Sequence, residues 1–144
     1  MKKLALLTLV VLVLSSCEIN KAPDEVNTFT QTYVVTAKSW IVGSDKSGAY
    51  LFYEFREPTL TPYIFENGIM NAYLVMGDAI SDGLSPLPFD DFLIGKDNYK
   101  WTEQVTCEFR PGFITFILKA DDHYNYMGSD PYFPEHKFLV RFMW

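Results

Sequence analysis

The chain has 144 residues, a formal net charge of −6, two cysteines and an aromatic content of 17 %. This length allows one domain of ordinary size, and the negative charge argues against a nucleic-acid partner because phosphate backbones would repel it. The aromatic side chains supply a large apolar area, which helps a domain of this size to fold without disulfides.

The amino terminus has the pattern of a secretory signal. Lys2 and Lys3 precede an apolar run from Leu4 to Leu14, broken only by Thr8. As a helix, about 11 residues reach only about 16 Å, whereas the hydrocarbon core of a bilayer is roughly 30 Å thick. The run is therefore too short to remain as a membrane span.

The run ends in Leu14-Ser15-Ser16-Cys17, which resembles the lipobox of bacterial lipoproteins. That resemblance implies cleavage before Cys17, diacylglycerol on its sulfur and an acylated amine, and two or more acyl chains anchor a protein stably. The alternative is an ordinary signal peptide with a coincidental cysteine. Cleavage leaves 128 residues and, with both signal lysines removed, a formal charge of −8. Membrane contact should then come through the acyl anchor and not through a basic face, because anionic lipid headgroups would repel an acidic chain.

We therefore expect a signal peptide at 1–16, a lipidated cysteine with a flexible tether at 17–27, and a folded domain at 28–144. Acidic Glu18, Asp24 and Glu25 partly match the surface-export signal of Bacteroidota lipoproteins. The expected location is the outer membrane, and both its cell-surface face and its periplasmic face remain as alternatives.

From residue 28 onward the pattern is that of β-strands. Runs rich in aromatic and β-branched residues, separated by turn-forming residues, predict six to eight short strands and an antiparallel, immunoglobulin-like β-sandwich. In "WTEQVTCEF" we expect Trp101, Val105, Cys107 and Phe109 on one face, with Glu103 marking an end near solvent. The predicted strands are 29–36, 49–55, 69–76, 101–109, 113–119 and 137–144, and "SWIV" either continues the first or forms another.

Two short stretches predict their local structure more specifically than the strand pattern does. Pro111-Gly112 predicts a type II turn, since proline presets the first φ and glycine accepts the positive second φ. Thr61, Pro62 and Gly68 suit the cap, first position and end of a helix of one or two turns.

The order of several weak motifs resembles a group of uncharacterised secreted lipoproteins of the Bacteroidota. This resemblance covers nearly all of the mature chain and implies a β-sandwich with no known activity. Some members carry a collagen-like segment after the lipidated cysteine, which this chain lacks. The matching residues are Trp40, Tyr53 with Phe55, Pro58, Leu60-Thr61, Asn67-Gly68-Ile69, Tyr73, Leu87-Pro88, Trp101-Thr102 and Pro111-Gly112.

The candidate ligand-binding residues are aromatic. Rings outside strands can stack on sugars or contact a partner protein, provided that they are exposed. If Tyr124, Tyr126 and Trp101 are buried, this version of a glycan site fails; the alternative is that the rings close the end of the sandwich. The candidates are Tyr99, Trp101, Tyr124, Tyr126 and Tyr132.

No metal or cofactor site is expected. His123 and His136 are too loosely spaced for a zinc site, and the acidic residues near them do not match a calcium loop. Cys107 is expected to pack as a small hydrophobic residue; a reactive thiol is the alternative. Asp90 and Asp91, being adjacent, should point apart on a strand.

The sequence thus predicts a lipid-anchored, non-catalytic cell-envelope protein that binds a ligand or partner, either a glycan or another envelope protein. A small hydrolase acting on glycan is one alternative, and it requires a cleft with acidic residues or a His–Ser pair. A structural envelope subunit is the other, and it requires a long edge strand or a donated strand.

Overall fold

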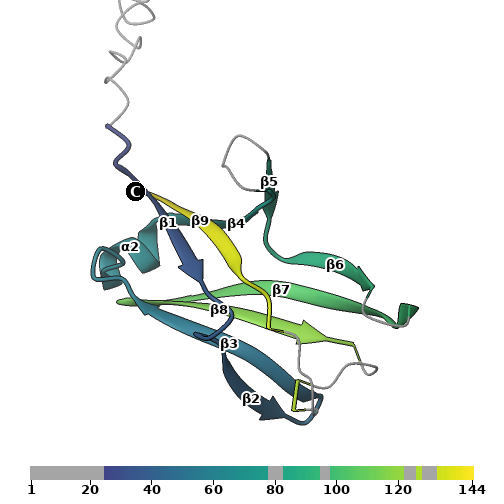
Figure 1. Ribbon diagram of the computed structural model, residues 1–144. Coiled ribbons are helices and arrows are strands. Elements are labelled where there is room, and N and C mark those ends of the chain that lie inside the picture. The colour runs from purple at the N-terminus through teal and green to yellow at the C-terminus, as the bar shows by residue number, and fades with distance from the viewer. Residues whose placement is uncertain (1–24, 78–82, 95–97, 122–125, 128–132) are drawn as a thin grey trace, which may run out of the picture.

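The computed structural model describes residues 25–77, 83–94, 98–121, 126–127 and 133–144. Two β-sheets pack face to face and one short helix lies at one end (Figure 1). The predicted all-β antiparallel sandwich is confirmed, but the described part of the chain has nine strands, one more than the upper limit of the six to eight predicted. These are β1 (Thr28–Val35), β2 (Ile41–Asp45), β3 (Gly48–Arg56), β4 (Ile69–Val75), β5 (Leu84–Pro86), β6 (Phe89–Ile94), β7 (Lys100–Arg110), β8 (Phe113–Ala120) and β9 (His136–Met143), with helix α2 (Pro62–Asn67) between β3 and β4.

The first and last strands lie side by side. One sheet has the order β1-β9-β4-β5 and the other β2-β3-β8-β7-β6, and every neighbouring pair is antiparallel. This order differs from the ABED and CFG order of immunoglobulin constant domains, so the likeness to that fold lies in architecture and not in connectivity. The eight-residue β1 is an edge strand, a feature that the structural-subunit alternative requires.

The core lies between the two sheets. Phe116 of β8 and Phe138 of β9 stack across it with ring centroids 3.8 Å apart, and both are fully buried. The alternation predicted for β7 is confirmed at its centre, because Val105 is fully buried while its neighbour Gln104 is exposed. In β9, Val140 and Phe142 are fully buried on either side of the exposed Arg141, but Leu139 is buried as well.

The helix and hairpin signals are also confirmed. The Thr61 side chain accepts a hydrogen bond from the Ile64 amide, and α2 begins at Pro62 and ends before Gly68. Gly68 has φ −93°, so its role is not a left-handed cap. A Cβ there would lie 2.6 Å from the Ile64 carbonyl oxygen, so a close backbone approach requires glycine. Gly112 has φ +81°, as a type II turn needs.

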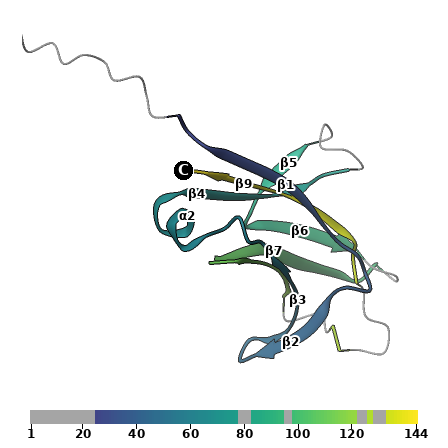
Figure 2. The same ribbon diagram turned by 90° about the vertical axis from the view of Figure 1, so that its left-hand side faces the viewer.

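The sandwich has two distinct ends (Figure 2). We call the end with α2, the β7–β8 turn and residue Asn27 the tether end; Asn27 and Trp144 exchange backbone hydrogen bonds of 2.9 and 3.1 Å there. The opposite end, where β7 and β9 begin, is the distal end. No helix within the described ranges is long and apolar enough to cross a bilayer.

Candidate functional site

Among the predicted aromatic candidates that the structure describes, only Tyr99 is exposed. Trp101 is 5 % exposed and Tyr126 is 1 % exposed, so these two rings do not meet the condition of exposure that a glycan site built on them requires. Tyr99 is 43 % exposed and stacks on Trp101, with ring centroids 5.9 Å apart. Tyr124 and Tyr132 lie outside the described residues. Trp101 and Tyr126 instead help to close the distal end, as the alternative interpretation expected.

Glu103 corrects a second expectation. Its position near the start of β7 predicted solvent exposure, but it is only 1 % exposed. The Tyr126 hydroxyl donates to Glu103 Oε2, and His136 Nε2 lies 3.9 Å from Glu103 Oε1. A buried carboxylate needs such partners, and they come from segments 23 and 33 residues further along the chain. The local sequence therefore could not reveal this burial.

Cys107, the candidate for a reactive thiol, packs as part of the fold. Burial raises the pKa of the Cys107 thiol, which packs half-buried against the core and is held as the unreactive protonated form. Within the ranges the structure describes, no three His, Cys, Asp or Glu residues are grouped as a metal site requires. His123 lies outside those ranges.

A different surface has the character of a binding site, and the sequence analysis missed it. The outer face of the five-stranded sheet carries two adjoining depressions of about 320 and 280 Å³ over β3, β8 and β7. They share Tyr50, Glu108 and Ile117, so they form one continuous surface. Ligand pockets have volumes of roughly 300–1,000 Å³, and each depression lies near the lower limit. We call this surface the β3–β8–β7 groove; it is lined by Asp45, Tyr50, Phe52, Glu54, Gln104, Thr106, Glu108, Phe109, Arg110, Thr115, Ile117 and Lys119.

The floor of the groove is apolar. Tyr50 and Phe52 alternate with the buried Leu51 on β3, and their ring centroids lie 5.9 Å apart at an interplanar angle of 47°. Phe52 is directly opposite Ile117 of β8. The Tyr50 ring crosses the edge strand at Gly43, where a Cβ would lie 2.6 Å from the ring. Glycine at position 43 thus leaves room for the ring to lie across the sheet.

One end of the groove is closed by an ion pair. Lys119 Nζ lies 3.0 Å from Asp45 Oδ2 and 6.0 Å from the centroid of the Tyr50 ring. The Ser47 hydroxyl and amide both donate to Asp45 Oδ1, at 2.5 and 2.7 Å. Hydrogen bonds from Ser47 and Lys119 lower the pKa of the Asp45 carboxyl to about 2. Asp45 is therefore ionised across the physiological pH range.

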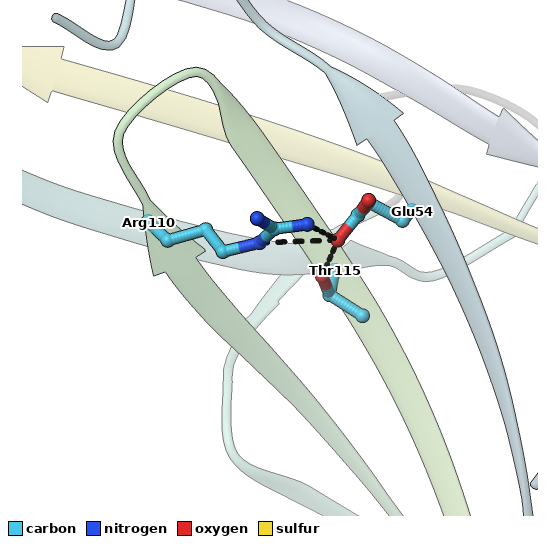
Figure 3. Close-up of polar contacts among 3 residues, drawn as sticks. All are labelled: Glu54, Arg110 and Thr115. Carbon is cyan, nitrogen blue, oxygen red and sulfur yellow. Dashed lines mark hydrogen bonds and ion pairs between the residues drawn. The ribbon is translucent and has the colours of Figure 1, made fainter.

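The other end carries a second charged cluster (Figure 3). Arg110 donates from Nε and Nη2 to Glu54 Oε2, at 3.2 and 2.5 Å, and the Thr115 hydroxyl donates to the same oxygen at 3.2 Å. The Arg110 hydrogen bonds lower the pKa of the Glu54 carboxyl. The Arg110 guanidinium also lies 4.0 Å from the centroid of the Phe113 ring. All three donors bind one oxygen, so Glu54 Oε1 accepts no hydrogen bond from another described residue.

Between the two clusters lies an exposed carboxylate. Glu108 of β7 is directly opposite Thr115 of β8 and makes no ion pair or side-chain hydrogen bond within the described part of the chain. Thr106 is opposite Ile117 in the same ladder. The groove therefore combines two aromatic rings with carboxylate and hydroxyl groups spaced along the strands. Comparison of the chain with protein-family models, with curated proteins and with solved structures found no match.

A second hollow lies at the distal end. It measures about 360 Å³, and Asp91, Glu135, His136 and Lys137 are among its lining residues. Asp91 is directly opposite Glu103 in the β6–β7 ladder. Asp90 is exposed and Asp91 is half-buried, so the two carboxylates point apart as predicted. The cleft with acidic residues that the hydrolase alternative requires is thus present at this end.

Proposed function

We propose that this chain is a lipid-anchored protein of the cell envelope, held in the outer membrane through Cys17, and that it binds glycan along the β3–β8–β7 groove without converting it. The proposal applies equally to a protein on the cell surface and to one on the periplasmic face of that membrane. The observation that carries it is the pair of rings Tyr50 and Phe52 between two charged clusters on an open sheet face. Sugars present apolar ring faces and hydroxyl edges, and this groove offers partners for both.

The charge state of the groove supports binding over hydrolysis. A glycosidase needs one carboxylic acid whose pKa is raised so that it can donate a proton to the leaving oxygen. Hydrogen bonds from Ser47 and Lys119 lower the pKa of Asp45, and hydrogen bonds from Arg110 lower that of Glu54. Carboxylates held ionised accept hydrogen bonds from hydroxyls, which suits recognition.

The test is a glycan array probed with the chain from residue 18 onward, followed by calorimetry on the glycans that bind. Removing a stacking ring weakens binding by roughly tenfold, or about 1.4 kcal/mol, so Phe52→Ala and Tyr50→Ala should each have an effect of this order. Phe92→Ala is the matched control, since Phe92 lies on the same sheet outside the groove and is 61 % exposed. The proposal fails if no glycan binds, or if the groove variants bind as well as the control.

A small glycan hydrolase is the second candidate, and the distal hollow favours it. Two carboxylates, those of Asp91 and Glu135, line that hollow. Such a pair can supply the two carboxyl groups of a glycosidase. Incubation with an oligosaccharide panel should then release reducing ends, and Asp91→Asn and Glu135→Gln should abolish the release. If the wild-type protein releases no reducing ends, the hydrolase is excluded.

A further inference from the structure

The tether end of the sandwich exposes apolar side chains. Val26 and Tyr63 are both 65 % exposed, Ile69 is 60 % exposed and Phe65 is 37 % exposed. Water-exposed apolar groups gathered on one face are typical of interaction surfaces. These four residues come from the segment before β1, from α2 and from the first position of β4.

The fold places them together at this end. Thr28, Met143 and Ile69 form one row across the four-stranded sheet, and Val26 lies just before that row. Helix α2 leads directly into Ile69 and buries only Ile64. Its two aromatic residues flank the buried position, and Tyr63 is largely and Phe65 partly exposed to water.

We propose that the tether end lies against the lipid surface, with Tyr63, Phe65, Ile69 and Val26 in the headgroup region. This inference rests on the proposed anchoring through Cys17. Nine residues lie between Cys17 and Asn27, which makes ten steps along the chain. An extended chain spans at most about 3.5 Å per step, so the tether end lies within about 35 Å of the anchor. A short tether gives the end a high effective concentration at the bilayer, so weak apolar contacts are enough.

The chemistry of the end suits a lipid interface. Tyrosine is enriched at headgroup level because its ring is apolar and its hydroxyl is polar. Charges of both signs surround the apolar residues, since Glu25 and Glu66 are exposed here together with Arg56 and Arg110. No single charge dominates, so the contact recognises the interface of zwitterionic lipid and not an anionic headgroup.

This orientation determines how the two candidate sites face relative to the membrane. Arg110 and Glu54 are near the tether end, whereas Asp45 and Lys119 are near the distal end. The β3–β8–β7 groove then runs away from the membrane, and the distal hollow opens on the side that faces away from the lipid.

The experiment uses the full lipidated chain in phosphatidylcholine vesicles, with one added cysteine carrying an environment-sensitive NBD fluorophore. Lipid blocks the Cys17 sulfur, and the Cys107 thiol is kept protonated by burial, so the added cysteine is the labelling site. Tyr63→Cys places the label at the tether end. Phe92→Cys is the matched control at the distal end, with a similar exposure of 61 %. Both labelled proteins are first checked for unchanged stability against urea.

We expect the label at residue 63 to shift to the blue and brighten roughly twofold or more, because the interface is less polar than water. The label at residue 92 should not change. If the chain floats with the vesicles and neither label responds, the anchoring through Cys17 is supported and the proposed contact of the tether end with lipid is wrong. If both respond equally, the domain lies on its side and the proposed orientation is wrong. If the chain does not float, the anchoring fails, and the contact that rests on it fails too.

Discussion

Tyr33→Phe is expected to destabilise the domain because it removes the donor to a buried carboxylate. Tyr33 and Glu57 are each 5 % exposed, and the tyrosine hydroxyl donates to Glu57 Oε2 at 2.5 Å. The Thr59 amide donates to Oε1 at 2.9 Å and is unaffected. Phenylalanine keeps the ring that packs on Phe55 and Phe116, at 5.0 and 6.1 Å between centroids. The substitution thus removes a hydroxyl without opening a cavity.

The expected loss follows from the charge on the acceptor. A hydrogen bond to a charged group contributes about 1.5–3 kcal/mol, and a buried group left without its partner loses an amount of this order. The unfolding entropy is about 2.1 cal/mol/K per residue, and residues 28–144 number 117. The entropy of unfolding of the domain is therefore about 0.25 kcal/mol/K at the melting temperature. Dividing the expected loss of stability by this entropy gives a fall in melting temperature of roughly 6–12 °C.

The assay is urea unfolding at pH 7, followed by tryptophan fluorescence, together with a thermal melt. Tyr53→Phe is the matched control, because Tyr53 packs on Phe55 from β3 and its hydroxyl bonds to no other described residue. The control should change stability by less than about 0.5 kcal/mol. If the Tyr33 variant loses no more than the control does, Glu57 does not depend on this hydroxyl and the reasoning is refuted.

Four further outcomes are expected. Burial and the bond to Glu57 raise the pKa of Tyr33 above its ordinary value of 10.0. Since the unfolded tyrosine then ionises first, the contribution of Tyr33 to the free energy of unfolding should not change between pH 7 and about pH 10 and should fall above it, as urea unfolding at a series of alkaline pH values would show. The Asp45 carboxyl should titrate near pH 2 by NMR, and Ser47→Ala should raise that midpoint because Ser47 provides its main hydrogen bonds. Gly112→Ala should cost about 1–2 kcal/mol in urea unfolding because φ is +81° there, while Gly112→Asn should lose less. Iodoacetamide at pH 8 should alkylate Cys107 only after the domain unfolds, as mass spectrometry would show, and rapid labelling of the native chain would contradict its raised pKa.

The strands and their inward faces could be predicted because alternation is a local property. Val105 in β7 and Phe138 in β9 follow from a period of two, and the Pro111-Gly112 turn follows from the φ requirements of two adjacent residues. Strand β6 was not predicted, since Phe89–Ile94 contains Asp90-Asp91 and resembles a polar loop. Acidic residues are depleted in strands, and only its pairing with β7 decides the matter.

The candidate groove could not be predicted because it depends on which strands are neighbours. Tyr50, Phe52 and Glu54 alternate on β3, and Thr115 and Ile117 alternate on β8, so each half is visible in the sequence. Only the register between the two strands puts Phe52 beside Ile117 and Glu54 beside Thr115. The same reason hides the burial of Glu103, whose partners come from two later segments.

The last strand of the chain occupies an interior place in its sheet. Strand β9 lies between β1 and β4 and is the sole described partner of β1. In chain order β1 comes long before β9, so the four-stranded layer can assemble only after β9 is available to pair with both β1 and β4. A truncation that removes His136–Met143 would therefore leave β1 and β4 without the strand that joins them.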